Sequence, residues 1–169
     1  MPSISPTHPS DLPFIRQLFE TAIAFQQAGG YPVWRGYDEA ILKAEMKKRQ
    51  HFKVLIADKI ACIFSLCYVD PMVWRERDQA DAIYLHRIIV STAFKGQRLF
   101  GKVLEWAIAH NRDMGRPFVR MDTWANNLKL TAYYQSFGFQ IVGYYQTPDS
   151  ELLPIQQRNN HVVLLEYTI

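Results

Sequence analysis

Apolar residues recur at helical spacing in four segments of the chain, which predicts four helices. In the first of them, Ser10 is the expected cap, Pro13 falls in the first turn and Gly29-Gly30 ends the helix. The four expected helices begin near Ser10, Asp38, Phe100 and Asn127 and end near Gln27, Gln50, Gly115 and Phe137.

Seven shorter segments are rich in β-branched and aromatic residues and are bounded by turn residues, so they are predicted to be strands. Two of them flank the turn Asp58-Lys59 and are expected to form a β-hairpin. The expected strands are Ser3–Pro6, Phe52–Ala57, Ile60–Val69, Ala82–Val90, Phe118–Trp124, Phe139–Tyr145 and Val162–Tyr167.

The order of these elements is β, α, α, β, β, β, α, β, α, β, β. Strand–helix–strand crossovers in the second half predict a mixed sheet of about seven strands flanked by about four helices, an α/β (α+β) fold. The 169 residues contain no repeat or obvious linker, and this length suits one domain covering 1–169.

Composition is that of an ordinary folded protein, with 49% hydrophobic and 21% charged residues. A net charge of +3 favours an anionic ligand, but the basic residues are scattered. The densest run, Lys47-Lys48-Arg49, reads as a solvated helix end. We therefore expect no nucleic-acid partner.

Cys62 and Cys67 lie on opposite faces of one expected strand, so they predict neither a disulfide nor a metal site. The first residues lack the basic and apolar parts of a targeting signal, and no apolar run approaches about 18 residues. These features predict a cytoplasmic protein with no membrane partner.

The segment Phe94–Lys102, here called the phosphate segment, reads Phe-Lys-Gly-Gln-Arg-Leu-Phe-Gly-Lys between a strand and a helix. A helix start exposes unpaired N–H groups and a partial positive charge, which suits a phosphate. Lys95, Arg98 and Lys102 add formal charge there. By itself the segment could equally be a solvated, glycine-containing turn.

A nucleotide hydrolase is a specific alternative, because Gly96 to Lys102 follows the P-loop spacing. Val103 stands where that loop needs a Ser or Thr hydroxyl for Mg²⁺. Leu99 and Phe100 also fit better as the buried first turn of a helix than as an exposed loop. The hydrolase hypothesis is therefore disfavoured.

The residues around the phosphate segment add a wider pattern. Ile88-Ile89-Val90 leads into it, Asn127 begins the following helix, and Tyr134-x-x-x-Gly138-Phe139 ends that helix. Together they resemble the GNAT superfamily of acetyl-CoA-dependent N-acetyltransferases, and the order of elements agrees over nearly the whole chain. The resemblance implies a single GNAT-like domain with a mostly antiparallel sheet, using acetyl-CoA as co-substrate and no metal.

The resemblance also implies which residues meet the cofactor: the strand backbone holds the pantetheine and the phosphate segment holds the pyrophosphate. The implied cofactor-binding residues are Ile88, Ile89, Val90, Lys95, Gly96, Gln97, Arg98, Leu99, Phe100, Gly101, Lys102, Asn127 and Tyr134. Asn126 is an equally good helix cap beside Asn127.

One departure from the family pattern lies in the phosphate segment. With Lys95 at the first basic position, the two glycines of the family fall on Arg98 and Phe100, where backbone N–H groups remain available to phosphate. A register starting at Arg98 recovers Gly101 but places Trp106 and Ala107 at the apolar helix positions.

Two residues are candidates for proton transfer. Tyr134 matches the family tyrosine that hydrogen-bonds the sulfur and protonates the leaving thiolate, with Tyr133 as the alternative. His86 lies in Leu85-His86-x-x-x-Val90, which is similar to serotonin N-acetyltransferases, where such a histidine helps to deprotonate the amine. A structural histidine is the other interpretation.

The acceptor site is expected to use the first helical pair and the charged loop 70–81, and its aromatic residues and arginines could equally be packing residues. The candidates are Tyr31, Trp34, Arg35, Tyr37, Trp74 and Arg75. They suit a small-molecule or peptide amine, and a homodimer stays open.

The leading hypothesis is an enzyme, an N-acetyltransferase that moves an acetyl group from acetyl-CoA to a primary amine of a small molecule or protein by direct attack in a ternary complex. The alternative is a non-catalytic CoA-binding sensor or interaction domain of the same fold. Tyr134 and His86 favour the enzyme, whereas the missing glycines favour the sensor.

Overall fold

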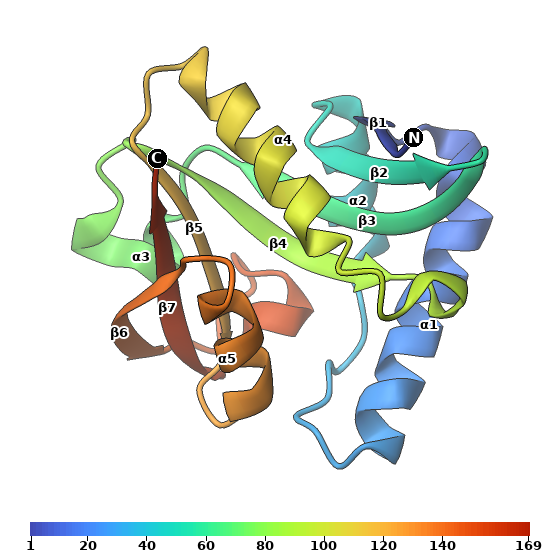
Figure 1. The fold of residues 1–169 in the computed structure, drawn as a ribbon. Helices are drawn as coiled ribbons and strands as arrows, with labels where there is room; N and C mark the ends of the chain where they lie inside the picture. The colour runs from blue at the N-terminus through green and yellow to red at the C-terminus, as the bar shows by residue number, and fades with distance from the viewer. The chain divides into compact units, whose positions relative to one another are not determined.

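The computed structural model describes residues 1–169 and contains seven strands and five helices (Figure 1). The strands are β1 Ser3–Pro6, β2 His51–Ile56, β3 Lys59–Cys67, β4 Ala82–Val90, β5 Phe118–Trp124, β6 Gln140–Gln146 and β7 His161–Thr168. The helices are α1 Leu12–Ala28, α2 Glu39–Lys47, α3 Pro71–Trp74, α4 Phe100–Arg112 and α5 Leu128–Gln135.

The strands form one sheet in the order β1-β2-β3-β4-β5-β7-β6. β1–β2, β2–β3, β5–β7 and β6–β7 pair antiparallel, whereas β4–β5 pairs parallel. The predicted α/β fold with a mixed, mostly antiparallel sheet is therefore confirmed. The short helix α3 is an addition, because it lies in the segment expected to be a charged loop.

The chain divides into two compact units that are described separately. The first comprises Met1–Leu66 and His86–Trp106, and the second comprises Cys67–Leu85 and Ala107–Ile169. β4 and α4 each contribute residues to both units, so neither unit is a continuous segment of the sequence.

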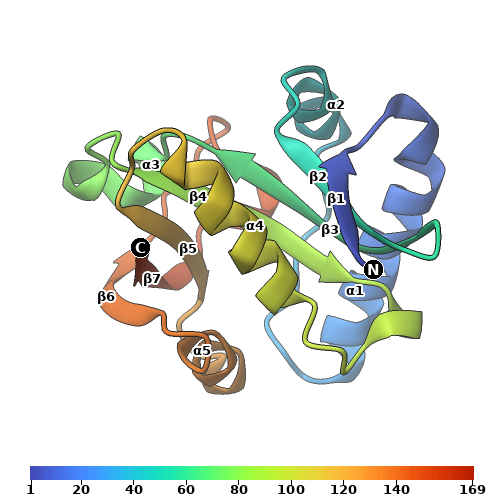
Figure 2. The same cartoon turned by 45° about the horizontal axis from the view of Figure 1, so that its top comes forward.

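In the first unit, β1, β2 and β3 lie side by side (Figure 2). α1 and α2 pack against one face of this sheet, where Phe19 and Leu42 meet Ile63 of β3 and Ile89 of β4. On the other face, Phe52 and Phe64 meet Trp106 of α4, with ring centroids 4.6 and 5.4 Å from the indole. Burying apolar rings on both faces of the strands stabilises this layered arrangement.

Two of the predicted helix caps are confirmed, whereas Ser10 is not a cap: it lies within a 3-10 turn, Pro9–Asp11, and α1 begins at Leu12 without a side-chain cap. The Asp38 carboxylate accepts hydrogen bonds from the Ala40 and Ile41 amides at the start of α2. Asn127 Oδ1 accepts from the Leu130 amide at the start of α5, at 3.1 Å, so Asn127 and not Asn126 is the cap. Each cap satisfies amides that the helix itself leaves unpaired.

In the second unit, β5 pairs with β7 along its whole length, from Phe118 opposite Thr168 to Trp124 opposite Val162. The core on one side combines Val73 and Trp74 of α3 with Tyr84 of β4 and Leu164 of β7. Packing of α3 in this core explains why the segment after β3 is ordered and not a solvated loop.

The parallel pairing of β4 and β5 is short. It joins Ala82–Tyr84 to Phe118–Arg120 and ends there, so Leu85 and Met121, next in register, are not partners. Beyond these residues the two strands no longer pair with each other, so the backbone N–H and C=O groups of their carboxyl ends are not used in a β4–β5 ladder. No helix of the protein combines the length and apolar character that a membrane crossing requires.

Candidate active site

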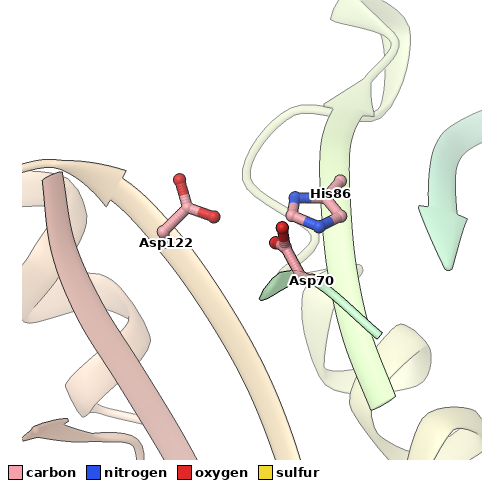
Figure 3. A group of neighbouring side chains, drawn as sticks. All are labelled: Asp70, His86 and Asp122. Carbon is pink, nitrogen blue, oxygen red and sulfur yellow. The ribbon is translucent and has the colours of Figure 1, made fainter. Parts of the chain in front are cut away.

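His86 stands with two carboxylates where the β4–β5 ladder ends. His86 and Asp122 each come two residues after the last paired residues, Tyr84 and Arg120, and Asp70 follows β3. One nitrogen of His86 and one oxygen from each of Asp70 and Asp122 lie within 4.8 Å of one another. Figure 3 shows both carboxylates turned toward the imidazole ring.

A hydrogen-bond network holds Asp70 in place. The Asp70 amide donates to Asp78 Oδ2 at 2.8 Å, and the Tyr84 hydroxyl donates to Asp78 Oδ1 at 2.8 Å. Burial raises the pKa of the Tyr84 hydroxyl, and its bond to Asp78 acts in the same direction, so this tyrosine remains a neutral donor.

Arg120 completes the network from β5. Its side chain is only 5% exposed and pairs with both Asp81 and Glu166 at 2.8 Å. It also donates to the Tyr84 hydroxyl at 3.2 Å and to the Arg77 carbonyl oxygen at 2.8 Å. A buried guanidinium with several acceptors fixes the segment that carries Asp70.

The residue after His86 has an unusual backbone conformation. Arg87 adopts a left-handed φ of 50° within β4, a conformation that costs a non-glycine residue on the order of 1–3 kcal/mol. Its guanidinium pairs with Glu45 of α2, and Glu45 also accepts a hydrogen bond from Ser65 at 2.8 Å. The anchored Arg87 side chain holds this bend just before the expected pantetheine-binding residues Ile88–Val90.

The phosphate segment has the open amides that an anion needs. Gly96 has a left-handed φ of 82° and Arg98 one of 50°, and α4 begins at Phe100. The amides of Gly96 and Leu99 donate to no group of the protein, whereas those of Gly101 and Lys102 are used within the first turn. Two free N–H groups at a helix start fit the pyrophosphate of acetyl-CoA.

The side chains of the segment divide into buried and exposed sets. Leu99 and Phe100 are 4% and 2% exposed, as expected for the first buried turn of the helix. Lys95, Gln97 and Arg98 are exposed. Lys102 pairs with Glu105 at 2.9 Å, which offsets one of the expected positive charges.

The ammonium of Lys95 lies over an aromatic ring of α1. Its nitrogen is 3.5 Å from the centroid of Phe25, and the Phe25 ring stacks on Tyr31 with centroids 5.9 Å apart. Among the acceptor-site candidates, Tyr31 therefore stacks on the ring that also holds Lys95, one of the predicted cofactor-binding residues.

The other candidates of the first unit are more embedded. Trp34 and Tyr37 pack against the core of the first unit, their ring centroids 5.8 and 4.9 Å from Phe19. Arg35 is exposed.

In the second unit, Trp74 is fully buried beside Tyr84 and Arg120, so it is removed from the candidates for substrate contact. Arg75 is exposed and its guanidinium lies 4.0 Å from the Tyr145 ring centroid. Tyr134 lies in α5, 8% exposed, with its ring against Tyr133 and Phe139.

Four residues of these arrangements had not been predicted: Asp70, Asp122, Glu45 and Phe25. Asp122 carried a signal, because it is a charged residue inside an otherwise mainly apolar strand. Asp70, Glu45 and Phe25 carry no such signal, because each of them makes contacts with residues far away along the chain.

Comparison with known proteins gives one sequence relative and many structural ones. No family model matches the chain. An uncharacterized N-acetyltransferase of Bacillus subtilis, YesJ, is 32% identical over 74 residues, which are 44% of this chain and 41% of that protein. The matched segment thus spans less than half of that relative.

The structural neighbours cover nearly the whole chain. A GNAT-family acetyltransferase from Listeria monocytogenes has a TM-score of 0.78 at 22% identity, covering 99% of this chain and 95% of that one. The ribosomal-protein-S18-alanine N-acetyltransferase of Escherichia coli has a TM-score of 0.68 at 19% identity, covering 100% and 94%.

A third neighbour was solved with its cofactor. YncA from Salmonella typhimurium, a putative acetyltransferase in complex with acetyl-CoA, has a TM-score of 0.67 at 16% identity, covering 99% and 94%. The chain has the GNAT acetyltransferase fold, as the sequence motifs predicted.

Proposed function

We propose that this protein transfers an acetyl group from acetyl-CoA to a primary amine of a small molecule or protein, by direct attack in a ternary complex. The observation that carries the proposal is the pair of open amides, those of Gly96 and Leu99, where the phosphate segment leads into α4, in a chain with the GNAT fold. Acetyl-CoA supplies the activated thioester.

His86 acts as the base. It takes a proton from the acceptor amine as the amine nitrogen bonds to the thioester carbonyl carbon.

The remaining steps belong to the backbone and to Tyr134. An amide of Ile88–Val90 stabilises the negative charge that develops on the carbonyl oxygen. Tyr134 donates its hydroxyl proton to the sulfur as the carbon–sulfur bond breaks, so that CoA leaves as the neutral thiol. The amides of Gly96 and Leu99, together with Lys95 and Arg98, hold the pyrophosphate.

Thermal shift and product release test the proposal together. Acetyl-CoA at about 100 times its dissociation constant should stabilise the protein by about 2.7 kcal/mol, whereas ATP with Mg²⁺ should give no shift. A panel of amines, including alanine peptides because one neighbour is named as a ribosomal-protein-S18-alanine N-acetyltransferase, should then give free CoA with at least one member. A shift with ATP–Mg²⁺ and none with acetyl-CoA would overturn the proposal.

The variant His86→Gln separates an enzyme from a sensor. It should keep the acetyl-CoA shift and lose most release of CoA, with the largest loss below the pKa of the amine, where the base is needed most. A protein that binds acetyl-CoA but releases no CoA with any amine, with or without the substitution, would be a sensor.

The CoA-release assay also tests whether the protein needs a metal ion, because two carboxylates and an imidazole could hold a divalent ion. Treatment with EDTA should leave the release of CoA unchanged. Loss with EDTA that Zn²⁺ restores would assign His86 to metal binding instead of proton transfer.

A further inference from the structure

Two contacts converge on one exposed aromatic ring of the first unit. The Phe25 ring of α1 is stacked on Tyr31, with an interplanar angle of 23°, and it carries the Lys95 ammonium 3.5 Å from its centroid. Phe25 remains 52% exposed. The core next to α1 is built by Ile15, Leu18 and Phe19, so packing does not require an aromatic residue at this position.

The end of α1 is shaped to hold this arrangement. A Cβ on Gly29 would lie 2.3 and 2.5 Å from two Tyr31 ring atoms, so only glycine leaves room for the ring there. Gln26 Oε1 accepts a hydrogen bond from the Trp34 amide at 2.9 Å and ties the following segment back to the helix. The Phe25–Tyr31 stack is therefore fixed on both sides of the turn.

Lys95 differs from Lys102, the other lysine of the phosphate segment. Lys102 is paired with Glu105, whereas Lys95 pairs with no carboxylate. The ring attracts the ammonium without neutralising it. Lys95 therefore keeps its full charge, and the amide of the next residue along the chain, Gly96, is open.

We propose that Phe25 is a positioning residue for cofactor binding: it holds Lys95 in the place where the lysine meets the pyrophosphate of acetyl-CoA. This rests on the proposed function. A flexible lysine loses rotamer freedom when it binds a phosphate, and a lysine already held by a ring loses less. Phe25 therefore strengthens binding without touching the reacting atoms.

The test compares acetyl-CoA with acetylpantetheine, which carries the same thioester but no phosphate. The variant Phe25→Leu should raise the dissociation constant and KM for acetyl-CoA by about two- to fivefold, because the freed lysine loses more rotamer freedom when it binds the phosphate. Turnover at saturation should stay the same, and KM for acetylpantetheine should not change. Phe25→Trp should restore wild-type binding, because its ring also attracts a cation.

Two controls separate this role from a structural one. Phe14→Leu removes another exposed ring of α1 and should change nothing. In a Lys95→Gln background, Phe25→Leu should have no further effect, because the pair acts as one unit. A full additional loss in that background, or an equal loss with acetylpantetheine, overturns the inference.

The two proposals fail in different ways. Wild-type protein that binds no acetyl-CoA contradicts the proposed function, and the inference with it. If the wild-type protein binds acetyl-CoA and the Phe25→Leu variant binds it equally well, only the inference about Phe25 is contradicted.

Discussion

Tyr134 and Tyr133 are adjacent on α5 but differ in their surroundings. Tyr134 is 8% exposed and its ring is packed against Phe139 at a centroid distance of 6.5 Å, whereas Tyr133 is only half-buried. A buried ring with a defined position suits a hydroxyl that must deliver a proton to one atom. The proposed acid is therefore Tyr134 and not its neighbour.

Tyr134→Phe should lower turnover by about 100-fold, the lower range for loss of a general acid, while the dissociation constant for acetyl-CoA stays nearly unchanged. The ring remains, so its packing is preserved. Steady-state release of CoA and thermal shift measure the two quantities. Tyr133→Phe is the matched variant; a loss there in place of Tyr134→Phe would transfer the acid role to Tyr133.

For single residues, the sequence predicted which side chains are buried in a helix better than it predicted which residues they contact. Leu99 and Phe100 follow one apolar stripe, and both are buried as expected. Trp74 stands among charged residues and could be either a substrate contact or a packing residue from the sequence; it is fully buried, with its ring near Tyr84 and Arg120. Such contacts depend on residues far away along the chain, which periodicity does not report.

Strand β4 is the element on which most of the candidate site depends, and its bend at Arg87 is held by another element. Glu45 of α2 pairs with Arg87, whose side chain is 8% exposed against 19% for Glu45. Breaking a buried pair leaves one charge without compensation. The position of the residues after Arg87 therefore depends on α2.

Glu45→Gln should reduce the free energy of unfolding by about 3 kcal/mol, because the buried Arg87 guanidinium loses its counter-charge. Urea unfolding measures the change. Glu39→Gln, on the same helix, removes an exposed pair with Arg16 and Lys43 and should have a much smaller effect. Equal losses of unfolding free energy in the two variants would show that the Glu45–Arg87 pair stabilises the protein no more than an exposed pair does.

The elements themselves were largely predictable, since all seven strands and four of the five helices follow clear apolar patterns. α3 was not, because its four residues are too few to show a period. The insertion of β7 between β5 and β6, and the short β4–β5 ladder, were not predictable either. Strand order and register are set by long-range packing that a single sequence does not display.

Each unit contains one buried ionic network: Glu45, Arg87 and Ser65 in the first, and Arg120 with Asp81 and Glu166 in the second. Such networks tie the stability of the whole molecule to the ionisation of buried groups. The first unit also contains a buried histidine, His51, whose pKa is lowered by burial and by the charge of Arg87.

His51 is fully buried, and its Nδ1 lies 2.8 Å from the Thr7 hydroxyl. Burial, helped by the charge of Arg87 and opposed by Asp11, lowers its pKa to about 3 from an ordinary value of 6.5. The folded protein therefore keeps His51 neutral at pH values where the unfolded chain binds a proton. Its contribution to stability is complete above pH 6.5 and is lost as the pH falls from 6.5 toward 3.

Between pH 6.5 and 5 the free energy of unfolding should therefore fall by about 2 kcal/mol, because each pH unit in this window is worth up to about 1.4 kcal/mol. Urea midpoints at several pH values measure the slope. The paired carboxyl of Glu39, whose pKa is lowered to about 2, loses its charge only at lower pH and does not contribute here. His51→Asn keeps a polar group near Thr7 and should flatten the profile above pH 5; a slope that persists in this variant would place the acid sensitivity elsewhere.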